Sequence, residues 1–251
     1  MKNILVLIIT ITLTQSVFSQ IENCSECDLK KYSEKDINHL TLLELKILRN
    51  EIFARHQYVF TDERLSDYFL NKYDWYKPNN KQLNNIELNH YEKENISLFS
   101  KKENEKINIK KTIIKELEIF LTSLNENDTS KINSVINKVT KDFNSEHKNV
   151  VVTELKDILT KINIKGIHWY NESGLYKIIT DDGYFLNETS IKIKGEEIIL
   201  SYNDMGHSEL LSDKTAFDFG SSYDSTNEYA SWYTFEIKNN KLILIKHQAA
   251  G

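Results

Sequence analysis

The stretch LLELKILRNEIFARHQYVFTDERLSDYFLNKYDWYKP, from Leu42 to Pro78, is more specific than a simple amphipathic pattern requires. Its first part carries apolar residues at Leu45, Leu48 and Ile52, and this spacing of three and four residues predicts a helix with one apolar stripe. We expect that helix to end near Gln57. The most distinctive segment of the chain is therefore predicted to begin with a helix.

Charged residues mark the end of this helix. Glu51 and Arg55 stand four residues apart with the acid first, an order that allows a helical ion pair worth about 0.2–0.5 kcal/mol. Arg55 and His56 should lie in the last turn, where cations meet the negative end of the helix dipole. His56 also continues the apolar stripe, so one of its faces should point toward the core.

A second helix is predicted after the apolar run Tyr58 to Phe60. Thr61 is its candidate N-cap, and Leu65, Tyr68 and Phe69 should point inward. The only proline of the chain follows the Trp-Tyr-Lys that closes this segment, and such a proline is typical of a rigid stop. The segment is thus predicted to be a compact pair of helices with aromatic residues between them.

Several separated clusters in this region carry a resemblance to a known family. They are Arg49, Asn50, Glu51, Ile52, Phe53, Ala54, Arg55 and His56, then Tyr58, Phe60, Tyr68, Phe69, Trp75, Tyr76, Lys77 and Pro78, and finally residues 88–96. The set resembles the YARHG domain, a short helical module of bacterial envelope proteins. The resemblance implies a helical domain over residues 35–103 of an exported accessory protein, and it implies no established biochemical role.

Two positions depart from the family pattern. Phe53 stands where the family has Tyr, which removes one hydrogen-bonding hydroxyl. Gln57 stands where the family has Gly, and at a left-handed helix cap a residue with a Cβ is disfavoured by about 1 kcal/mol. The fold can accommodate both changes.

The motif residues allow two interpretations. In the first, Arg55 and His56 are exposed beside Trp75 and Tyr76 and form an aromatic and cationic surface for a glycan or carboxylate ligand. In the second, His56 is buried with its ring nitrogens bonded to the backbone, and Arg55 ties the helix end to the next loop. The residues of this family motif and candidate binding surface are Arg49, Asn50, Glu51, Phe53, Arg55, His56, Trp75 and Tyr76.

The N-terminal segment has the features of a secretory signal. A largely apolar segment from Ile4 to Leu13 follows Lys2, and Val17-Phe18-Ser19 before Gln20 suits a signal-peptidase site. We expect residues 1–19 to be removed, which makes the protein exported, periplasmic or extracellular. Anchoring as a lipoprotein through Cys24 is disfavoured because the preceding residues lack the small side chain of lipid-attachment motifs.

The two cysteines of the chain, Cys24 and Cys27, lie in a predicted flexible lead-in over residues 20–34. A thiol redox pair normally follows a strand at a helix start, and a zinc site needs two further ligands nearby. Neither condition is met in the sequence. We therefore favour a small local disulfide or a free pair, in an oxidising compartment.

The composition excludes some partners. The formal net charge is −5 and the sequence pI is about 5.9, whereas nucleic acid and anionic lipid call for clustered Lys and Arg. With 40% hydrophobic residues the chain can form cores, and its length suits two modest domains. We expect the second domain to span residues 104–251.

This second part is predicted to have helices first, over about residues 108–162, and antiparallel strands after them, over about 163–247. One helix should end at the break Asn125 to Asp128, and Val150 to Val152 is a candidate strand. Turn signals at Asp181 to Gly183, Gly195 and Lys238 to Lys241 predict three hairpins. The fold class is therefore α+β, a small all-helical N-terminal module followed by helices packed on a curved antiparallel sheet. The element order is similar to nuclear-transport-factor-2-like domains.

The sequence contains no recognised catalytic motif, and we expect no enzymatic activity, no cofactor and no metal site. His168 and His207 are interpreted as structural, and the pairs Asp181-Asp182 and Glu196-Glu197 as solvated turn residues.

We expect an exported, non-catalytic envelope protein that binds an envelope component, peptidoglycan or protein, with no membrane span in the mature chain. The alternative is a cone-shaped α+β domain that binds a small ligand or acts as an enzyme, with the helical module as tether. A deep pocket with a His or carboxylate at its base would favour the alternative. An interior filled by Trp169, Trp232 and Phe235 would disfavour it.

Overall fold

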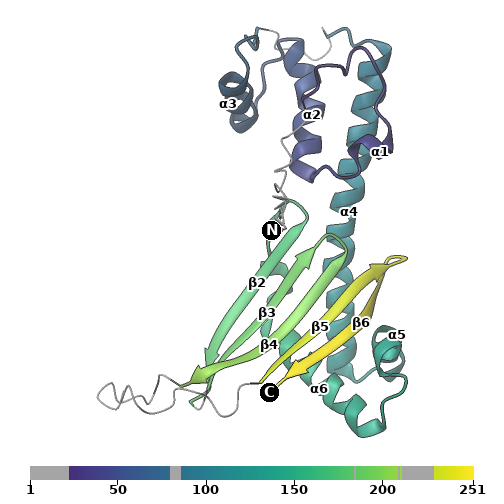
Figure 1. Cartoon of the computed structure of the whole chain (residues 1–251), viewed down its shortest axis with the longest axis vertical. Helices are drawn as coiled ribbons and strands as arrows, with labels where there is room; N and C mark the ends of the chain where they lie inside the picture. Colours follow the sequence, from purple (N-terminus) through teal and green to yellow (C-terminus); the bar gives the residue numbers. More distant parts are fainter. Residues whose placement is uncertain (1–22, 80–85, 184, 209, 211–228) are drawn as a thin grey trace, which may run out of the picture.

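The computed structural model describes residues 23–79, 86–183, 185–208, 210 and 229–251. The predicted signal segment, residues 1–19, lies outside these residues, and so does the side chain of His207. We call residues 23–79 and 86–105 the helical unit, and the described residues from 106 onward the sheet unit. Figure 1 shows the helical unit above the sheet unit, with one long helix running through both.

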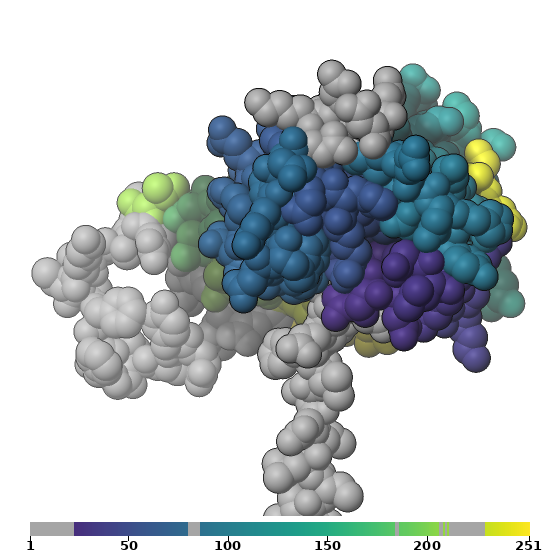
Figure 2. All heavy atoms as spheres, turned by 90° about the horizontal axis from the view of Figure 1, so that it is seen from above, coloured from purple at the N-terminus to yellow at the C-terminus, as the bar shows by residue number. Residues whose placement is uncertain are grey.

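The helical unit contains the helices α1 (Glu34–Ile37), α2 (Leu42–Arg55) and α3 (Glu63–Lys72) and the first part of α4 (His90–Glu126). Seen from above, the N-terminal segment, the α2–α3 region and the start of α4 pack side by side (Figure 2). Their interior comprises two clusters of buried residues, one around α1, α2 and α4 and one between α2 and α3. The predicted pair of helices is present.

Local capping sets the ends of α2 and α3. Thr41 and Glu44 form a capping box at the start of α2, and the helix ends at Arg55 before Gln57, which adopts a left-handed conformation with φ 59°. The prediction of Thr61 as the N-cap of α3 is wrong: Asp62 takes this role, and its side chain accepts a hydrogen bond from the Arg64 N–H. A carboxylate is also favoured at this end by the helix dipole.

Helix α4 is continuous over 37 residues, or roughly 55 Å at 1.5 Å per residue. The sequence predicts that a first helix runs on through a charged connector over residues 100–108 and that a second helix follows it. That connector contains no Gly or Pro, and its charged side chains form ion pairs along the helix surface, among them Lys102 with Glu105. Nothing in the connector interrupts the backbone hydrogen bonds, so the two predicted helices are one.

Helices α5 (Thr129–Thr140) and α6 (Ser145–Lys161) follow. The break predicted before α5 is present, because Asn127 is left-handed and the side chain of Asp128 caps α5. The strand predicted at Val150 to Val152 is wrong, since these residues lie inside α6. The buried side chain of Val151 packs in the core of the sheet unit, and this tertiary packing outweighs the strand preference of three consecutive valines.

A short 3₁₀ turn, Ile164–Gly166, leads into a six-stranded antiparallel sheet in which each strand pairs with the next along the chain. The first strand begins at His168, and Ile164 and Ile167, which we assigned to a strand, precede it. The strands are β1 (His168–Tyr170), β2 (Ser173–Asp181), β3 (Phe185–Lys194), β4 (Glu197–His207), β5 (Ala230–Lys238) and β6 (Lys241–Ala250).

The predicted hairpin turns are present. Gly195, between β3 and β4, has φ 62°, and Asn239 and Asn240, between β5 and β6, have φ 51° and 58°. Two consecutive residues with positive φ are typical of the type I′ turn that joins antiparallel strands. In Figure 1, α4 and α6 run behind the sheet, and α5 lies beside β6 at the lower right. One cluster of buried residues joins these helices to β3–β6, which confirms the α+β class.

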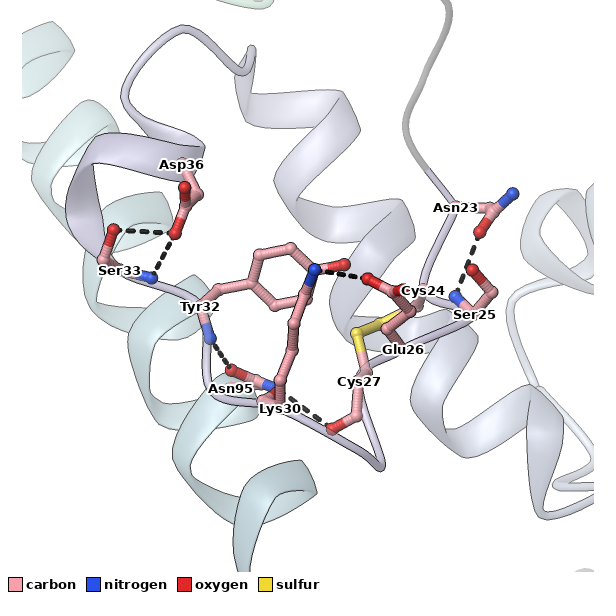
Figure 3. A network of polar contacts seen from close by, with 10 residues as sticks. All are labelled: Asn23, Cys24, Ser25, Glu26, Cys27, Lys30, Tyr32, Ser33, Asp36 and Asn95. Atoms are coloured by element: carbon pink, nitrogen blue, oxygen red, sulfur yellow. Dashed lines mark hydrogen bonds and ion pairs between the residues drawn. A yellow bond between two sulfur atoms is a disulfide. The ribbon is translucent and has the colours of Figure 1, made fainter.

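The segment around the two cysteines is part of the helical unit. Cys24 and Cys27 are joined in a disulfide, and their exposed fractions are 0% and 1%. Figure 3 shows how Asn95 of α4 holds this segment: its amide group donates to the carbonyl oxygens of Cys27, at 3.0 Å, and Lys30, at 2.8 Å, and its Oδ1 accepts from the Tyr32 N–H. The prediction of a flexible lead-in is therefore wrong from residue 23 on.

The turn between β1 and β2 contacts the helical unit. The Glu172 carboxylate accepts a hydrogen bond from the Leu42 N–H at 2.9 Å and lies 2.6 Å from Lys106 Nζ, and Asn171 Oδ1 accepts from the Leu43 N–H. The first N–H groups of a helix have no partner within that helix and form its positive end. The turn thus caps α2 from the sheet unit.

Candidate functional site

A groove of about 770 Å³ runs along one side of α6. Its walls are a stripe of α6 residues three or four positions apart and two tyrosines at the adjacent end of the sheet, Tyr202 and Tyr229. A volume of this size is typical of small-ligand sites. The lining residues on α6 are Ser145, Glu146, Asn149, Val150, Thr153, Glu154, Asp157, Ile158 and Lys161.

The Glu154 carboxylate accepts hydrogen bonds from three hydroxyl groups of the sheet. Tyr229 Oη lies 3.2 Å from Oε1, Tyr233 Oη lies 2.6 Å from Oε2, and Ser231 Oγ also donates to Oε1. Ser231 and Tyr233 are fully buried. We call Glu154, Tyr229, Ser231 and Tyr233 the Glu154 cluster. Burial, and then Glu154, raises the pKa of the Tyr233 and Tyr229 hydroxyls, so both remain neutral donors.

The opposite wall is organised around Tyr202 of β4. Its hydroxyl oxygen lies 2.5 Å from Asn187 Oδ1 and 2.7 Å from Asp204 Oδ1. Burial, followed by the hydrogen bond to Asp204, raises the pKa of the Tyr202 hydroxyl. Lys161 Nζ lies 5.5 Å from the centre of the Tyr202 ring, within the range of a cation–π contact.

His247 of β6 supports the Glu154 cluster from the next strand. It pairs directly with Tyr233 across the β5–β6 ladder, and the two rings are stacked with centroids 4.4 Å apart. His247 Nε2 is buried and has no hydrogen-bond partner among the described residues. Burial lowers the pKa of His247, and the nearby Glu154 offsets part of this effect.

The groove and the core fill different parts of the sheet unit. Phe235 is fully buried and Trp169 packs against the core, whereas Trp232 lies on the other side of β5 and is 38% exposed. Trp169, Trp232 and Phe235 therefore do not fill the interior together. Glu154 lines the groove. A carboxylate in the lining is one feature of the pocket that we expected to favour a ligand-binding sheet unit.

The motif residues of the helical unit form internal contacts. Glu51, with an exposed fraction of 0%, accepts hydrogen bonds from Arg55 Nη2 at 2.7 Å and from Tyr73 Oη at 3.0 Å. The Arg55 guanidinium lies 5.1 Å from the centre of the Trp75 ring, and Trp75 stacks on Tyr73. Arg55 thus links α2 to Trp75 in the segment after α3, which is the contact that the first interpretation places at this surface.

Among the described residues, His56 bonds to a side chain of α4 and not to the backbone, unlike the second interpretation. It is the C-cap of α2, its side chain is 29% exposed, and Nε2 lies 2.7 Å from a Glu92 carboxylate oxygen of α4. The helix ends before His56, which turns the ring toward α4.

The other motif residues also form contacts within the helical unit. Arg49 forms a two-point ion pair with Glu103 of α4, and Asn50 donates to the Lys46 carbonyl one turn earlier in α2. The hydroxyl of Tyr76 donates to the Tyr58 carbonyl. Phe53 is half-buried against the cluster between α2 and α3.

Sequence reasoning missed the groove. The α6 stripe has the spacing of a helical face, but the three valines at 150–152 led us to a strand and so hid the pattern. Tyr229, which directly precedes β5, alternates in sequence with Ser231 and Tyr233 of β5, and this period of two is the signal that places them on one face. His168, Glu196 and Glu197, which we left without a functional role, are exposed.

Among the described residues, no group of three or more His, Cys, Asp or Glu side chains is placed to hold a metal ion. Within the same part of the chain, no helix combines the length and apolar character that a membrane span requires.

Comparison with known proteins gives one match. The family model of the YARHG domain matches residues 21–104, a range that begins earlier than predicted and includes the disulfide segment. No curated protein and no solved structure matches the chain, so the similarity of the C-terminal part to nuclear-transport-factor-2-like domains stays a prediction. YARHG domains are often found in extracellular or periplasmic proteins. The predicted resemblance to the YARHG family is therefore confirmed over residues 21–104.

Proposed function

We propose that the chain is an exported, non-catalytic binding protein of the cell envelope, in which the groove along α6 holds a small ligand. The observation that carries this proposal is the Glu154 cluster, because a carboxylate fixed by three hydroxyl donors borders a groove of ligand size. Fixed polar groups beside aromatic rings are typical of sites that orient a ligand.

The hydrogen bonds of Glu154 support a binding role over a catalytic one. Both oxygens already accept hydrogen bonds from the protein, from Ser231 and Tyr229 on one side and from Tyr233 on the other. A general base must reach the proton that it removes, and three hydrogen bonds leave Glu154 little freedom to reorient. Glu154 is therefore better suited to hold a charge in place than to transfer a proton.

The helical unit supports the assignment to the envelope. YARHG domains are often found in extracellular or periplasmic proteins, and the Cys24–Cys27 disulfide suits an oxidising compartment. The net charge of −5 is unsuited to nucleic acid. We propose that the YARHG domain positions the sheet unit in the envelope, with the Glu172 turn and α4 connecting the two.

A ligand screen tests this role for the groove. Saturation-transfer NMR of the mature chain, with a library of neutral, anionic and cationic fragments, should identify ligands whose signals vanish in the double variant Tyr202→Ala Tyr229→Ala. The matched control, Trp75→Ala in the helical unit, should retain them. The proposal is overturned if no fragment binds, or if the groove variant binds every fragment as wild type does.

A second candidate role belongs to the Arg55–Trp75 surface. Trp75 is 37% exposed with the Arg55 guanidinium against its ring, an arrangement that can also stack on a sugar ring. Retention of the mature chain on purified peptidoglycan, lost in Arg55→Ala Trp75→Ala and kept in Tyr229→Ala, would support a glycan role. Equal retention of the two variants would exclude this surface.

A further inference from the structure

We propose that the ligand of the groove is a small organic cation, a molecule that carries an ammonium or guanidinium group. This inference rests on the proposed binding role of the groove and assigns its chemical class. Three features of the groove support it: the charge of its walls, the neutral partners of Glu154 and the aromatic faces opposite α6.

The first feature is an excess of carboxylates. Glu146, Glu154 and Asp157 line the groove from α6, and Lys161 is the only basic side chain among the described lining residues. Among the described residues, none of the three carboxylates forms an ion pair within 4.0 Å. Like charges along one wall attract a cation and repel an anion.

The second feature is how Glu154 is held. Its partners Tyr229, Ser231 and Tyr233 are hydroxyl groups, which stabilise a carboxylate without cancelling its charge. Lysine or arginine partners would have neutralised it. The negative charge of Glu154 therefore remains available to a ligand at the edge of the cluster.

The third feature is the pair of aromatic rings. The centroids of Tyr202 and Tyr229 lie 6.4 Å apart, and the rings are inclined at 46°. The ammonium of Lys161 already lies 5.5 Å from the Tyr202 ring, so the chain itself places a cation on one of these faces. A ligand cation would contact the Tyr229 ring beside Glu154, where no cation–π contact to a side chain occurs among the described residues.

Titration calorimetry on the mature chain tests the assignment with two pairs of probes. Choline is compared with its neutral isostere 3,3-dimethylbutan-1-ol, and 1,4-diaminobutane with butane-1,4-diol. The cations should bind at least ten times more tightly than their neutral counterparts. Their affinity should fall as salt is raised, because the attraction is electrostatic.

Variants locate the site. Asp157→Asn changes an exposed side chain and should weaken 1,4-diaminobutane several-fold, and Glu154→Gln should weaken it about ten-fold or more. Glu63→Gln, an exposed carboxylate of α3 in the helical unit, should leave the affinity unchanged. A melting curve of each variant verifies folding, and Asp157→Asn keeps the test valid if Glu154→Gln does not fold.

The outcomes separate the inference from the function on which it rests. If neutral and cationic probes bind equally, or if Glu63→Gln weakens binding as much as Asp157→Asn, the cation assignment is wrong. If the cations fail while neutral fragments still bind in a Tyr229-dependent way, the ligand class is wrong and the groove remains a binding site. If no fragment binds the groove at all, both proposals fail.

Discussion

The helical unit and the sheet unit use their polar side chains in opposite ways. In the helical unit the buried carboxylates Glu44, Glu51 and Glu92 each have a partner in the same unit, as a capping residue or across helices. In the sheet unit the Glu154 cluster lies at the edge of the core and borders the groove. Polar side chains therefore stabilise the fold in the first unit, and in the second they border the groove for which we propose a ligand.

This contrast changes how the family motif is understood. The motif residues are the most distinctive of the chain, and their main contacts, such as Arg49 with Glu103 and Arg55 with Glu51, are internal. A distinctive polar motif can thus arise from the need to pair buried groups, since an unpaired buried charge costs several kcal/mol. The groove residues belong to no motif that we recognised.

The largest effect is expected in the apolar core of the sheet unit. Phe235→Ala should lower the free energy of unfolding by about 3–5 kcal/mol, because it leaves a cavity beside Phe120. Urea denaturation followed by circular dichroism measures the change. Thr234→Ala, the neighbour on the other face of β5, is the control and should cost about 1 kcal/mol or less. Equal losses for the two variants would show that the core is not where the structure places it.

The matching test in the helical unit removes a buried charge. Glu51→Ala should cost about 2–4 kcal/mol, less than for a fully buried pair because Arg55 is 30% exposed on its side chain. The variant leaves the Arg55 guanidinium and the Tyr73 hydroxyl without their acceptor. The fluorescence of Trp75 during urea denaturation reports on this region. The control is Glu63→Ala, on the exposed side of α3, which should change the free energy of unfolding by about 0.5 kcal/mol or less. If Glu51→Ala lost no more stability than this control, a structural role for the motif would be contradicted.

The disulfide should contribute less. Cys24 and Cys27 close a very short loop, for which chain-entropy estimates give roughly 2 kcal/mol. The double variant Cys24→Ser Cys27→Ser should therefore lose about that amount in thermal or urea denaturation, together with any cost of burying two hydroxyls. Ser25→Ala, at an exposed position between them, is the control. If the double serine variant melted at the same temperature as wild type, the result would support the flexible lead-in that the sequence predicted.

The smallest effect is a dependence on pH near the groove. Burial lowers the pKa of His247 below its usual 6.5, so the unfolded chain binds a proton more readily than the folded one. Stability from this residue is complete above about pH 6.5 and is lost as the pH falls below that value. The melting temperature of His247→Gln should vary less than that of wild type between about pH 7.5 and 5.5. Parallel curves for the two proteins would show that His247 does not contribute.

Much of the fold could be predicted from the sequence, where the signal is local. The spacing of the apolar residues predicted α2. Turn residues such as Gly195 and Asn240, which have positive φ in the structure, predicted the hairpin turns. The failures came where distant residues decide. Val151 is helical because of the core behind it, and the segment at Cys27 is ordered by Asn95, far along the chain. The groove was missed for the same reason, since it joins α6 to strands that follow 40 or more residues later.

The structure assigns Trp75 to the stability of the helical unit, and we propose that Tyr229 contributes to ligand binding in the groove. One pair of variants tests this division of roles directly. Trp75→Ala and Tyr229→Ala are each tested for melting temperature and for calorimetric binding of 1,4-diaminobutane. We predict that Trp75→Ala lowers the melting temperature and keeps wild-type affinity, whereas Tyr229→Ala loses at least ten-fold in affinity with a smaller change in melting temperature. The reverse pattern, with binding lost in Trp75→Ala and kept in Tyr229→Ala, would contradict the account and return the binding site to the YARHG domain.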